Sequence, residues 1–206
     1  MACRPRCSFC CIFCTFYSLF IIFFFSIIIF FIIFHPSNVK FYVTEASLTQ
    51  FNLSSNNTLS YNFRVNITVR NPNKHITVSY RSITAIAWYK KRAFAWVSLA
   101  PFVQGQKNTS ILQPAVFEGQ RVIPLKPRHV AEYNKETQAG VYENVVVDLD
   151  VRVKAKYGRI KGVSFRPPVV QCRLRVPLVS NGTSASPFNV TKCGTGYFFA
   201  DRDSTA

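Results

Sequence analysis

The sequence predicts an all-β sandwich domain that follows a single membrane-spanning helix. Three observations support this prediction: an uncharged run of 23 residues near the N terminus, period-two alternation of apolar and polar residues after it, and turn residues between the alternating stretches. After the run, about 170 of the 206 residues remain, which is enough for one ordinary domain. We therefore divide the chain into a cytosolic tail (1–11), a transmembrane helix (12–34) and one β domain (35–206).

The uncharged run, residues 12–34, contains nine Phe and eight Ile. As a helix it would rise roughly 35 Å, at about 1.5 Å per residue, and a bilayer's hydrocarbon core is roughly 30 Å thick. A cleaved signal peptide is the competing interpretation. Its apolar region is shorter, about 7–15 residues, and ends in a small-x-small site. The run exits instead through His35-Pro36-Ser37, so we expect an uncleaved signal anchor.

Flanking charges indicate the orientation of this anchor. Arg4, Arg6 and the amino terminus precede the run, whereas Lys40 is the first cation after it. Because basic residues favour the cytosolic side, we expect the N terminus in the cytosol and the β domain in the lumen or outside the cell. This arrangement excludes a freely soluble cytosolic protein and a polytopic transporter.

Sequons for N-linked glycosylation agree with this orientation, since all six matches to Asn-x-Ser/Thr lie after the run. Polar loops produce some matches by chance. Together with the anchor, however, the six favour glycan acceptor sites in a secretory compartment. The candidate acceptors are Asn52, Asn56, Asn66, Asn108, Asn181 and Asn189.

The seven cysteines form two groups, and the larger lies at the cytosolic edge of the expected helix. Flanking apolar and basic residues there favour reversible S-palmitoylation, and unmodified small residues are the alternative. A zinc site is disfavoured because no further ligand pair follows at finger spacing. This group consists of Cys3, Cys7, Cys10, Cys11 and Cys14.

The second group consists of Cys172 and Cys193, which can pair only with each other inside the β domain. An oxidising compartment permits such a disulfide. In the chain-entropy model, closing a loop of about 20 residues stabilises a fold by roughly 3 kcal/mol. We predict a disulfide between these two residues that pins the last expected strand to its neighbour.

Alternation after Pro36 predicts antiparallel strands with one face on a core and one in solvent. It is clearest in residues 147–156, where Val147, Leu149 and Val151 alternate with Asp148 and Asp150. Short strands separated by turn signals favour a sandwich, which we assign as immunoglobulin/fibronectin-III-like. The expected strands are 39–48, 63–70, 77–88, 95–99, 110–117, 147–156, 172–176 and 196–200, and a short helix is expected at 128–139.

No residue pattern typical of catalysis or of a bound cofactor occurs in the sequence. His35, His75 and His129 form no paired-ligand motif, and there is neither a nucleophile elbow nor a Gly-rich phosphate loop. Asp148 and Asp150 lie at alternate positions of an expected strand, as in an ordinary charged exterior. We predict that the chain is not an enzyme, binds no metal and needs no cofactor.

The charge is strongly positive, with 25 Lys and Arg against nine Asp and Glu. The expected orientation separates the domain from nucleic acid, so we predict no nucleic-acid partner. The remaining alternatives are a solvated basic face, or a surface that attracts acidic polysaccharide or anionic lipid headgroups. If the strands concerned are neighbours, one basic stripe would consist of Arg152, Lys154, Lys156, Arg173 and Arg175.

Three segments carry a resemblance to a known family: residues 63–74 (FRVNITVRNPNK), residues 101–109 (PFVQGQKNT) and residues 172–178 (CRLRVPL) followed by Cys193. The first resembles the strand and Asn71-Pro72-Asn73 turn of the water-stress and hypersensitive-response domain of late embryogenesis abundant group 2 proteins. The other two are similar to the membrane-anchored plant branch, the non-race-specific disease resistance and harpin-induced-like proteins. The turn itself has a structural explanation, because Pro fixes φ and Asn bonds its own backbone.

The resemblance covers nearly the whole chain. It implies a non-enzymatic, single-pass protein of the plasma membrane, in some members at plasmodesmata, with a β-sandwich outside the cell. It also implies interaction or signalling in plant defence against pathogens or in abiotic stress, with protein partners in defence signalling. The alternative is a structural stress protein that protects the membrane, or tethers it to the wall, through nonspecific basic contacts.

Overall fold

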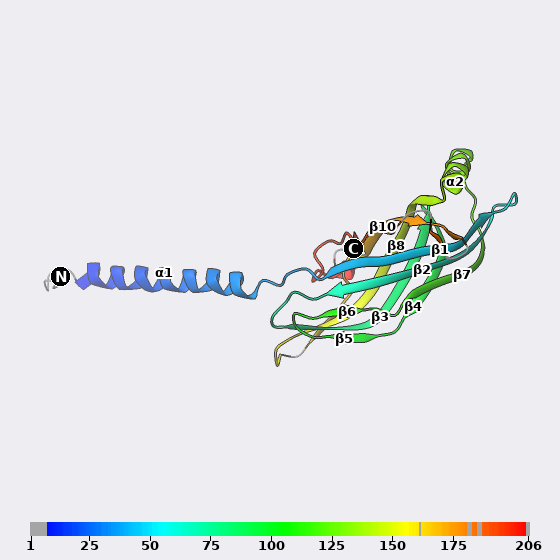
Figure 1. Cartoon of the computed structure of the whole chain (residues 1–206). Helices are drawn as coiled ribbons and strands as arrows, with labels where there is room; N and C mark the ends of the chain where they lie inside the picture. The colour runs from blue at the N-terminus through cyan, green and yellow to red at the C-terminus, as the bar shows by residue number, and fades with distance from the viewer. Residues whose placement is uncertain (1–7, 161, 181–182, 185–186, 205–206) are drawn as a thin grey trace. The chain divides into compact units, whose positions relative to one another are not determined.

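The computed structural model describes residues 8–160, 162–180, 183–184 and 187–204. The chain separates into two compact units, with the boundary between Ser37 and Asn38. The helix α1 (Ser8–Phe34) belongs to the first unit, and the second contains all the strands and α2 (Pro127–Ala139) (Figure 1). The prediction of a mostly β chain with an N-terminal apolar helix is confirmed.

The helix α1 begins four residues before the predicted 12 and ends at the predicted residue. Its segment Ile12–Ile29 has a mean hydropathy of 2.6, and none of that segment is buried inside the protein. Two hydroxyl groups return to the helix backbone, since Thr15 Oγ1 donates to Ile12 O at 2.8 Å and Ser26 Oγ to Ile22 O at 2.7 Å. By length and composition, α1 is therefore able to cross a membrane.

The second unit consists of two antiparallel sheets and a small hairpin. The first sheet has the order β13-β1-β2, with β6 and β7 both paired to β2, and the second has the order β10-β8-β3-β4, with β5 paired to β3 and β9 to β8 (Figure 1). The hairpin joins β11 to β12. The strands are β1 (Lys40–Leu53), β2 (Thr58–Arg70), β3 (Ile76–Tyr89), β4 (Arg92–Leu99), β5 (Phe102–Gln104), β6 (Thr109–Ile111), β7 (Ala115–Val122), β8 (Val141–Tyr157), β9 (Val163–Phe165), β10 (Val170–Pro177), β11 (Val179–Ser180), β12 (Thr183–Ser184) and β13 (Thr191–Lys192).

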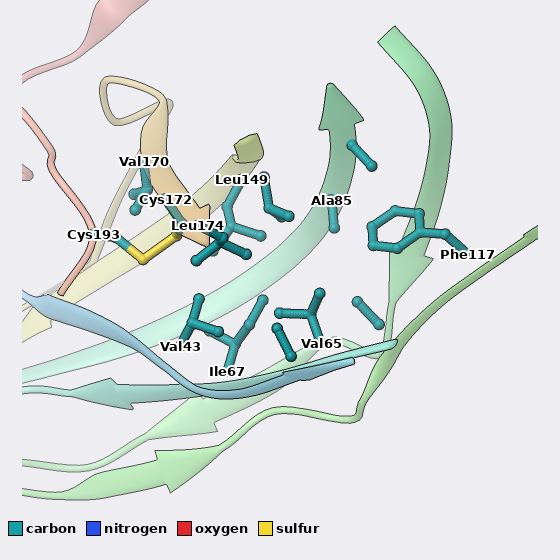
Figure 2. Packing of buried hydrophobic residues seen from close by; sticks show 14 of the residues in the cluster. Val43, Val65, Ile67, Ala85, Phe117, Leu149, Val170, Cys172, Leu174 and Cys193 are labelled. Atoms are coloured by element: carbon teal, nitrogen blue, oxygen red, sulfur yellow. A yellow bond between two sulfur atoms is a disulfide. The ribbon is translucent and has the colours of Figure 1, made fainter. Parts of the chain in front are cut away.

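The two sheets share one hydrophobic core. Successive side chains of a strand point to opposite faces, so the alternating apolar residues of both sheets meet between them. Val43, Val65 and Ile67 of the first sheet point towards Leu149 and Leu174 of the second, and all five are buried (Figure 2). The period-two pattern in the sequence thus identified the residues that hold the sheets together.

The helix α2 covers one end of the sheets (Figure 1). It begins one residue before the predicted 128 because Pro127 occupies the first turn, where a missing N–H costs no hydrogen bond. It ends at Gly140, whose φ of 65° is left-handed and whose N–H caps the carbonyl groups of Glu136 and Thr137. Gly140 leads directly into β8.

An aromatic cluster fills the end of the core beneath α2. The rings of Phe51 and Tyr142 have centroids 4.7 Å apart, and those of Phe51 and Tyr89 are 5.1 Å apart. Tyr133, the buried residue of α2, accepts a hydrogen bond from Leu53 N and donates one to Phe51 O, both at 2.9 Å. Burial raises the pKa of Tyr142 to about 12. The cluster therefore attaches α2 to the end of β1.

A buried lysine also connects α2 to the β3–β4 turn. Lys90 is 8% exposed, and its Nζ lies 2.9 Å from Glu132 Oε2 and 2.7 Å from Glu136 Oε1. Burial acts to lower the pKa of Lys90, but hydrogen bonds and charges from the two carboxylates together raise it. Tyr89 also donates to Glu136 at 2.9 Å, so the turn is attached by two adjacent side chains.

Two predicted strands differ from the structure. The strand expected at 110–117 is two strands, β6 and β7, separated by residues 112–114, and the strand expected at 196–200 is absent. Residues 196–200 form bends and turns, and the last strand of the described chain is β13. Phe198 is fully buried, as a strand residue would be, but Asn38 fixes it in a turn: Asn38 Oδ1 accepts from Phe198 N at 2.9 Å and Asn38 Nδ2 donates to Gly196 O at 3.3 Å. A buried aromatic residue in an aromatic-rich segment therefore suggested a strand where the backbone forms a turn.

Candidate interaction surface

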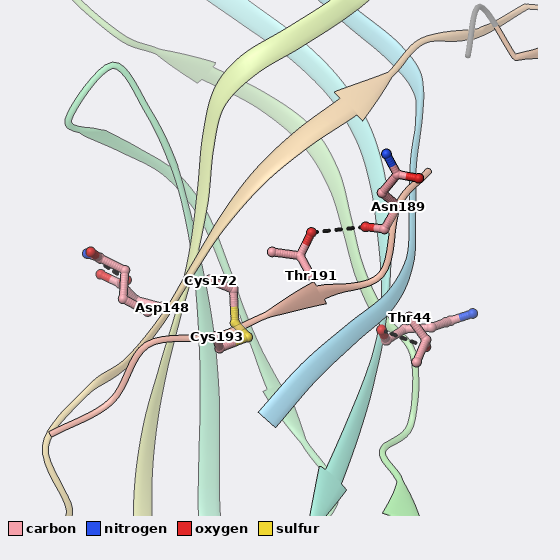
Figure 3. Close-up of a disulfide and its surroundings, with 8 residues drawn as sticks. Thr44, Asp148, Cys172, Asn189, Thr191 and Cys193 are labelled. Atoms are coloured by element: carbon pink, nitrogen blue, oxygen red, sulfur yellow. Dashed lines mark hydrogen bonds between the residues drawn. A yellow bond between two sulfur atoms is a disulfide. The ribbon is translucent and has the colours of Figure 1, made fainter. Parts of the chain in front are cut away.

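A disulfide joins the edges of the two sheets. Cys172 lies in β10 of the second sheet and Cys193 follows β13 of the first; the two are bonded, with their Cα atoms 4.3 Å apart (Figure 3). Both half-cystines are buried in the common core. The predicted bond is present, but it pins the segment after β13 rather than a strand at 196–200.

The segment around Cys193 bridges both sheets through its backbone. Lys192 pairs with Tyr42 of β1, and Cys193 N donates to Phe41 O at 3.0 Å. Gly194 N and O each bond to Gln171 of β10 at 2.8 Å. Residues 191–194 therefore close the side of the core where β1 and β10 lie next to each other.

The basic residues of β8 lie on the outer face of the second sheet. Arg152 is opposite Ser82 of β3, Lys154 is opposite Ser79 of β3 and Ser164 of β9, and Lys156 is opposite Thr77. Arg152 and Lys156 are exposed and Lys154 is half-buried. None of the three forms an ion pair with a described residue, so this face presents three cations to solvent.

The register of β10 on β8 corrects the single basic stripe expected from the sequence. The two strands are neighbours, but Arg173 is opposite Val146. Six residues along β8 separate Val146 from Arg152, which is about 20 Å and exceeds a Debye length of about 8 Å. Arg175 Nε lies 3.6 Å from Glu143 Oε1. The five residues therefore form two separate groups.

Between the two groups lies a carboxylate that binds the C-terminal segment. Asp150 Oδ2 lies 3.1 Å from Arg166 Nη2, and its Oδ1 lies 3.0 Å from Arg202 Nη2. Arg202 belongs to a 3-10 helix (Arg202–Ser204), and its backbone N–H donates to Arg166 O at 2.7 Å. The sequence had suggested that Asp150 belongs to an ordinary charged exterior, whereas the structure shows that it binds two arginines.

The sequons lie mostly on exposed parts of the second unit. Asn52 lies near the end of β1, Asn56 in the β1–β2 turn, Asn108 before β6 and Asn189 before β13, and all four are exposed. Asn66 differs, because it is half-buried on β2 and its Nδ2 donates to Glu45 Oε2 at 2.7 Å. The remaining candidate, at position 181, lies outside the described residues.

The Asn-Pro-Asn turn forms part of a buried polar network. Asn71 is fully buried; its Oδ1 accepts from Asn73 N at 3.1 Å, which is the expected bond of an Asn side chain to its own backbone. Its Nδ2 donates to Ile76 O at 2.7 Å and to Gly105 O at 2.9 Å. Pro72 is half-buried at the turn. The motif therefore joins the β2–β3 turn to the loop after β5.

Gln104, the last residue of β5, completes this network. It is fully buried, and its Nε2 donates to Val69 O at 2.7 Å and to Asn108 O at 3.1 Å. Its Oε1 accepts from Tyr80 Oη at 3.3 Å. Asn71 N also donates to Asn108 O at 2.9 Å. Asn71 and Gln104 come from the two segments, 63–74 and 101–109, that resemble the family. Together they bind the backbone carbonyl of Asn108, while the Asn108 side chain stays exposed.

The N-terminal cysteines are only partly described. Cys10, Cys11 and Cys14 lie in the first turns of α1, and Cys14 is a free, exposed thiol. The other two, at positions 3 and 7, lie outside the described residues. Within the described part of the chain, no group of three His, Cys, Asp or Glu side chains is arranged to hold a metal ion.

Sequence reasoning missed one cation beside the disulfide. Lys192 is exposed and lies with Arg173 on the walls of an open groove of about 400 Å³. Lys192 could have been found from the sequence because it precedes Cys193, which the predicted disulfide attaches to Cys172 of β10.

The sequence is similar to a known protein family and to several plant proteins. A family model described as late embryogenesis abundant protein matches residues 66–172. NDR1/HIN1-like protein 10 of Arabidopsis thaliana is 40% identical over 157 residues, which are 75% of this chain and 68% of that protein. NDR1/HIN1-like protein 3 of the same plant is 35% identical over 81% of this chain and 71% of that protein.

A third relative, NDR1/HIN1-like protein 2 of Arabidopsis thaliana, is 31% identical over 79% of this chain and 67% of that protein. A solution structure of a putative late embryogenesis abundant protein aligns with 67% of this chain and 72% of that chain, at 13% identity and a TM-score of 0.32. The match to the family model contains the Asn71 turn, Gln104 and Cys172, which the structure places in the turn network and the disulfide. The chain belongs to the late embryogenesis abundant group 2 family, among the NDR1/HIN1-like proteins.

Proposed function

We propose that this chain is a single-pass membrane protein that acts in plant defence or stress responses through contacts of its β domain, without catalysis. The observation that carries the proposal is the combination of α1, an uncharged helix long enough to span a bilayer, with an exposed, strongly basic β unit in a family of NDR1/HIN1-like proteins. The N terminus lies in the cytosol and the β unit outside the plasma membrane, as the flanking charges favour.

Exposed sequons support the outward placement of the β unit. Asn52, Asn56, Asn108 and Asn189 are accessible to a glycan in the folded protein. The disulfide is also of a kind that persists in oxidising compartments. We propose plasmodesmata as one of the places where the protein resides. We also propose that the N-terminal cysteines are reversibly acylated; among them, Cys14 is a free thiol in the first turns of α1.

The topology is tested by expressing the full chain in plant cells. Glycosidase treatment should lower its apparent mass, and protease added outside intact cells should remove the β unit. An unchanged mass together with a protected β unit would show that the N-in orientation is wrong.

We also propose that the two sheets form a sandwich of the immunoglobulin/fibronectin-III-like kind. The purely antiparallel pairing of the named strands and the single core between two sheets support this assignment. An experimental structure that placed the strands in a different order would overturn it.

A second candidate function is a structural tether between the membrane and acidic polysaccharide or lipid. Arg152, Lys154 and Lys156 favour it, because they share one face and have no carboxylate partner among the described residues. Cross-linking in intact tissue distinguishes the two functions. We expect a defined set of protein partners that persists when the three residues are changed to Gln. Capture that follows only charge and salt would support the tether instead.

A further inference from the structure

The open groove beside the disulfide is formed by two segments that are distant in the sequence. One wall is β10 with the residue before it, and the other is the segment that runs from β13 past Cys193 (Figure 3). Its volume of about 400 Å³ is within the range of small-ligand sites, about 300–1,000 Å³. The groove is lined by Val169, Gln171, Arg173, Lys192, Gly194, Thr195 and Gly196.

Two cations without a carboxylate partner among the described residues line this groove, one from each wall. Arg173 donates from Nε to Gln171 Oε1 at 3.2 Å, which orients the guanidinium group, and it forms no ion pair with a described residue. Lys192, on the other wall, is exposed and likewise has no ion pair among the described residues. The groove therefore favours an anion, and the planar guanidinium group matches a carboxylate.

Other groups in the groove match the rest of a sugar ring. Thr195, another lining residue, has a buried Oγ1 without a hydrogen-bond partner among the described residues, so a small shift of this wall would let a ligand hydroxyl satisfy it. Val169 is 37% exposed and adds apolar surface, and Gly194 and Gly196 add no side chain to the opposite wall. Cations on both walls and an apolar side chain on one of them suit a sugar acid, which has a carboxylate as well as apolar C–H groups.

The disulfide holds the two walls together. Cys172 lies between Gln171 and Arg173, and Cys193 lies between Lys192 and Gly194, so each half-cystine is flanked by groove residues. Among the described residues, the backbone connects these walls directly through two further hydrogen bonds, both between Gln171 and Gly194. The spacing of the two cations therefore depends on the bond.

We propose that this groove binds a uronate residue of an acidic polysaccharide, and that reduction of the Cys172–Cys193 disulfide weakens the binding. A dithiol reductant would give two electrons and two protons to the disulfide, which becomes two thiols while the reductant becomes a disulfide. The proposal deepens the tether function described above and rests on it for the encounter with the wall. Binding by the purified protein is measured independently of the membrane orientation.

The test uses the full chain in nanodiscs of zwitterionic lipid and an oligogalacturonate of defined length as the probe. We expect Arg173→Gln and Lys192→Gln each to raise the dissociation constant by about fivefold, the worth of one charge-assisted hydrogen bond. Lys135→Gln, the matched control, removes the same charge from an exposed position of α2, outside the groove, and should change the dissociation constant less than twofold. Equal weakening by the control would overturn the proposal, because binding would then follow net charge.

Two further arms test the ligand class and the disulfide. The fully methyl-esterified oligomer and inorganic phosphate should bind at least about tenfold more weakly; phosphate binding as tight as that of the uronate would overturn the sugar assignment. Dithiol treatment and a Cys172→Ala/Cys193→Ala variant, each checked for retained tryptophan fluorescence and circular dichroism, should weaken binding about fivefold or more. Unchanged affinity in a folded, reduced protein would overturn the role of the disulfide.

Discussion

Replacing Gln104 by Ala should destabilise the β unit far more than its position next to a loop suggests. The side chain is fully buried and forms three hydrogen bonds, with Val69 O, Asn108 O and Tyr80 Oη. Removing it leaves a buried carbonyl and a buried hydroxyl without this partner, whereas Asn108 O keeps its bond from Asn71 N.

The magnitude follows from these unsatisfied groups. Each costs about 1–3 kcal/mol, and two such groups predict a loss of about 2–6 kcal/mol in the free energy of unfolding. For a domain of this size, about 2–4 °C per kcal/mol converts the loss into a decrease of about 4–24 °C in the melting temperature. Gln104→Glu should be at least as harmful, because a buried carboxylate would face the carbonyl groups of Val69 and Asn108.

The assay is thermal unfolding of the full chain in nanodiscs, followed by the fluorescence of Trp88 and Trp96, which lie in β3 and β4. Gln106→Ala is the matched control, because this exposed glutamine lies two residues along the same loop. A melting temperature of Gln104→Ala within about 1 °C of that of Gln106→Ala would refute the structural role assigned to the network.

Three further predictions concern other parts of the β unit. Glycan occupancy should be lowest at Asn66, whose amide already donates to a neighbouring carboxylate, and high at Asn108; peptide mass spectrometry after glycosidase treatment measures both. The hydrogen bond from Lys90 lowers the pKa of Glu132 in the folded protein. The ion pair between Glu132 and Lys90 therefore contributes its full stability above the pKa of an unfolded Glu, about 4.3, and this contribution is lost as the pH falls through the lower pKa of the folded state. Melting curves between pH 3 and pH 6 should show this loss, and Glu132→Gln should reduce it. Cys172→Ser should cost about 2–4 kcal/mol in denaturant unfolding, and two free thiols in non-reducing mass mapping would contradict the disulfide.

Strands could be predicted where burial alternates strictly along the chain. In β8 and β10 the buried residues occupy every second position over most of the strand, and Leu149 and Cys172 show in the sequence the period they show in the structure. The strand expected at 196–200 is absent, because only Phe198 is buried there and the side chain of Asn38 holds its backbone in a turn.

The polar contacts could not be predicted in the same way. Asn71 is of a type that normally signals an exposed turn and Gln104 is a polar residue at the end of a short strand, yet the approach of the loop after β5 to the β2–β3 turn buries both. The basic stripe failed for a related reason. Sequence period fixes which face Arg152 and Arg173 occupy, but the register of β10 on β8 fixes how far apart they are.

The closing segment at residues 191–194 also determines what the two sheets can do with other copies of the chain. β1 and β10 would otherwise end their sheets with unpaired N–H and C=O groups, which readily recruit another strand. The two residues of β13 pair with part of β1, and Gly194 pairs with part of β10. The disulfide between Cys193 and Cys172 holds this segment in place. This short segment therefore protects part of both sheet edges, and its release would expose unpaired N–H and C=O groups to strand pairing with other copies of the chain.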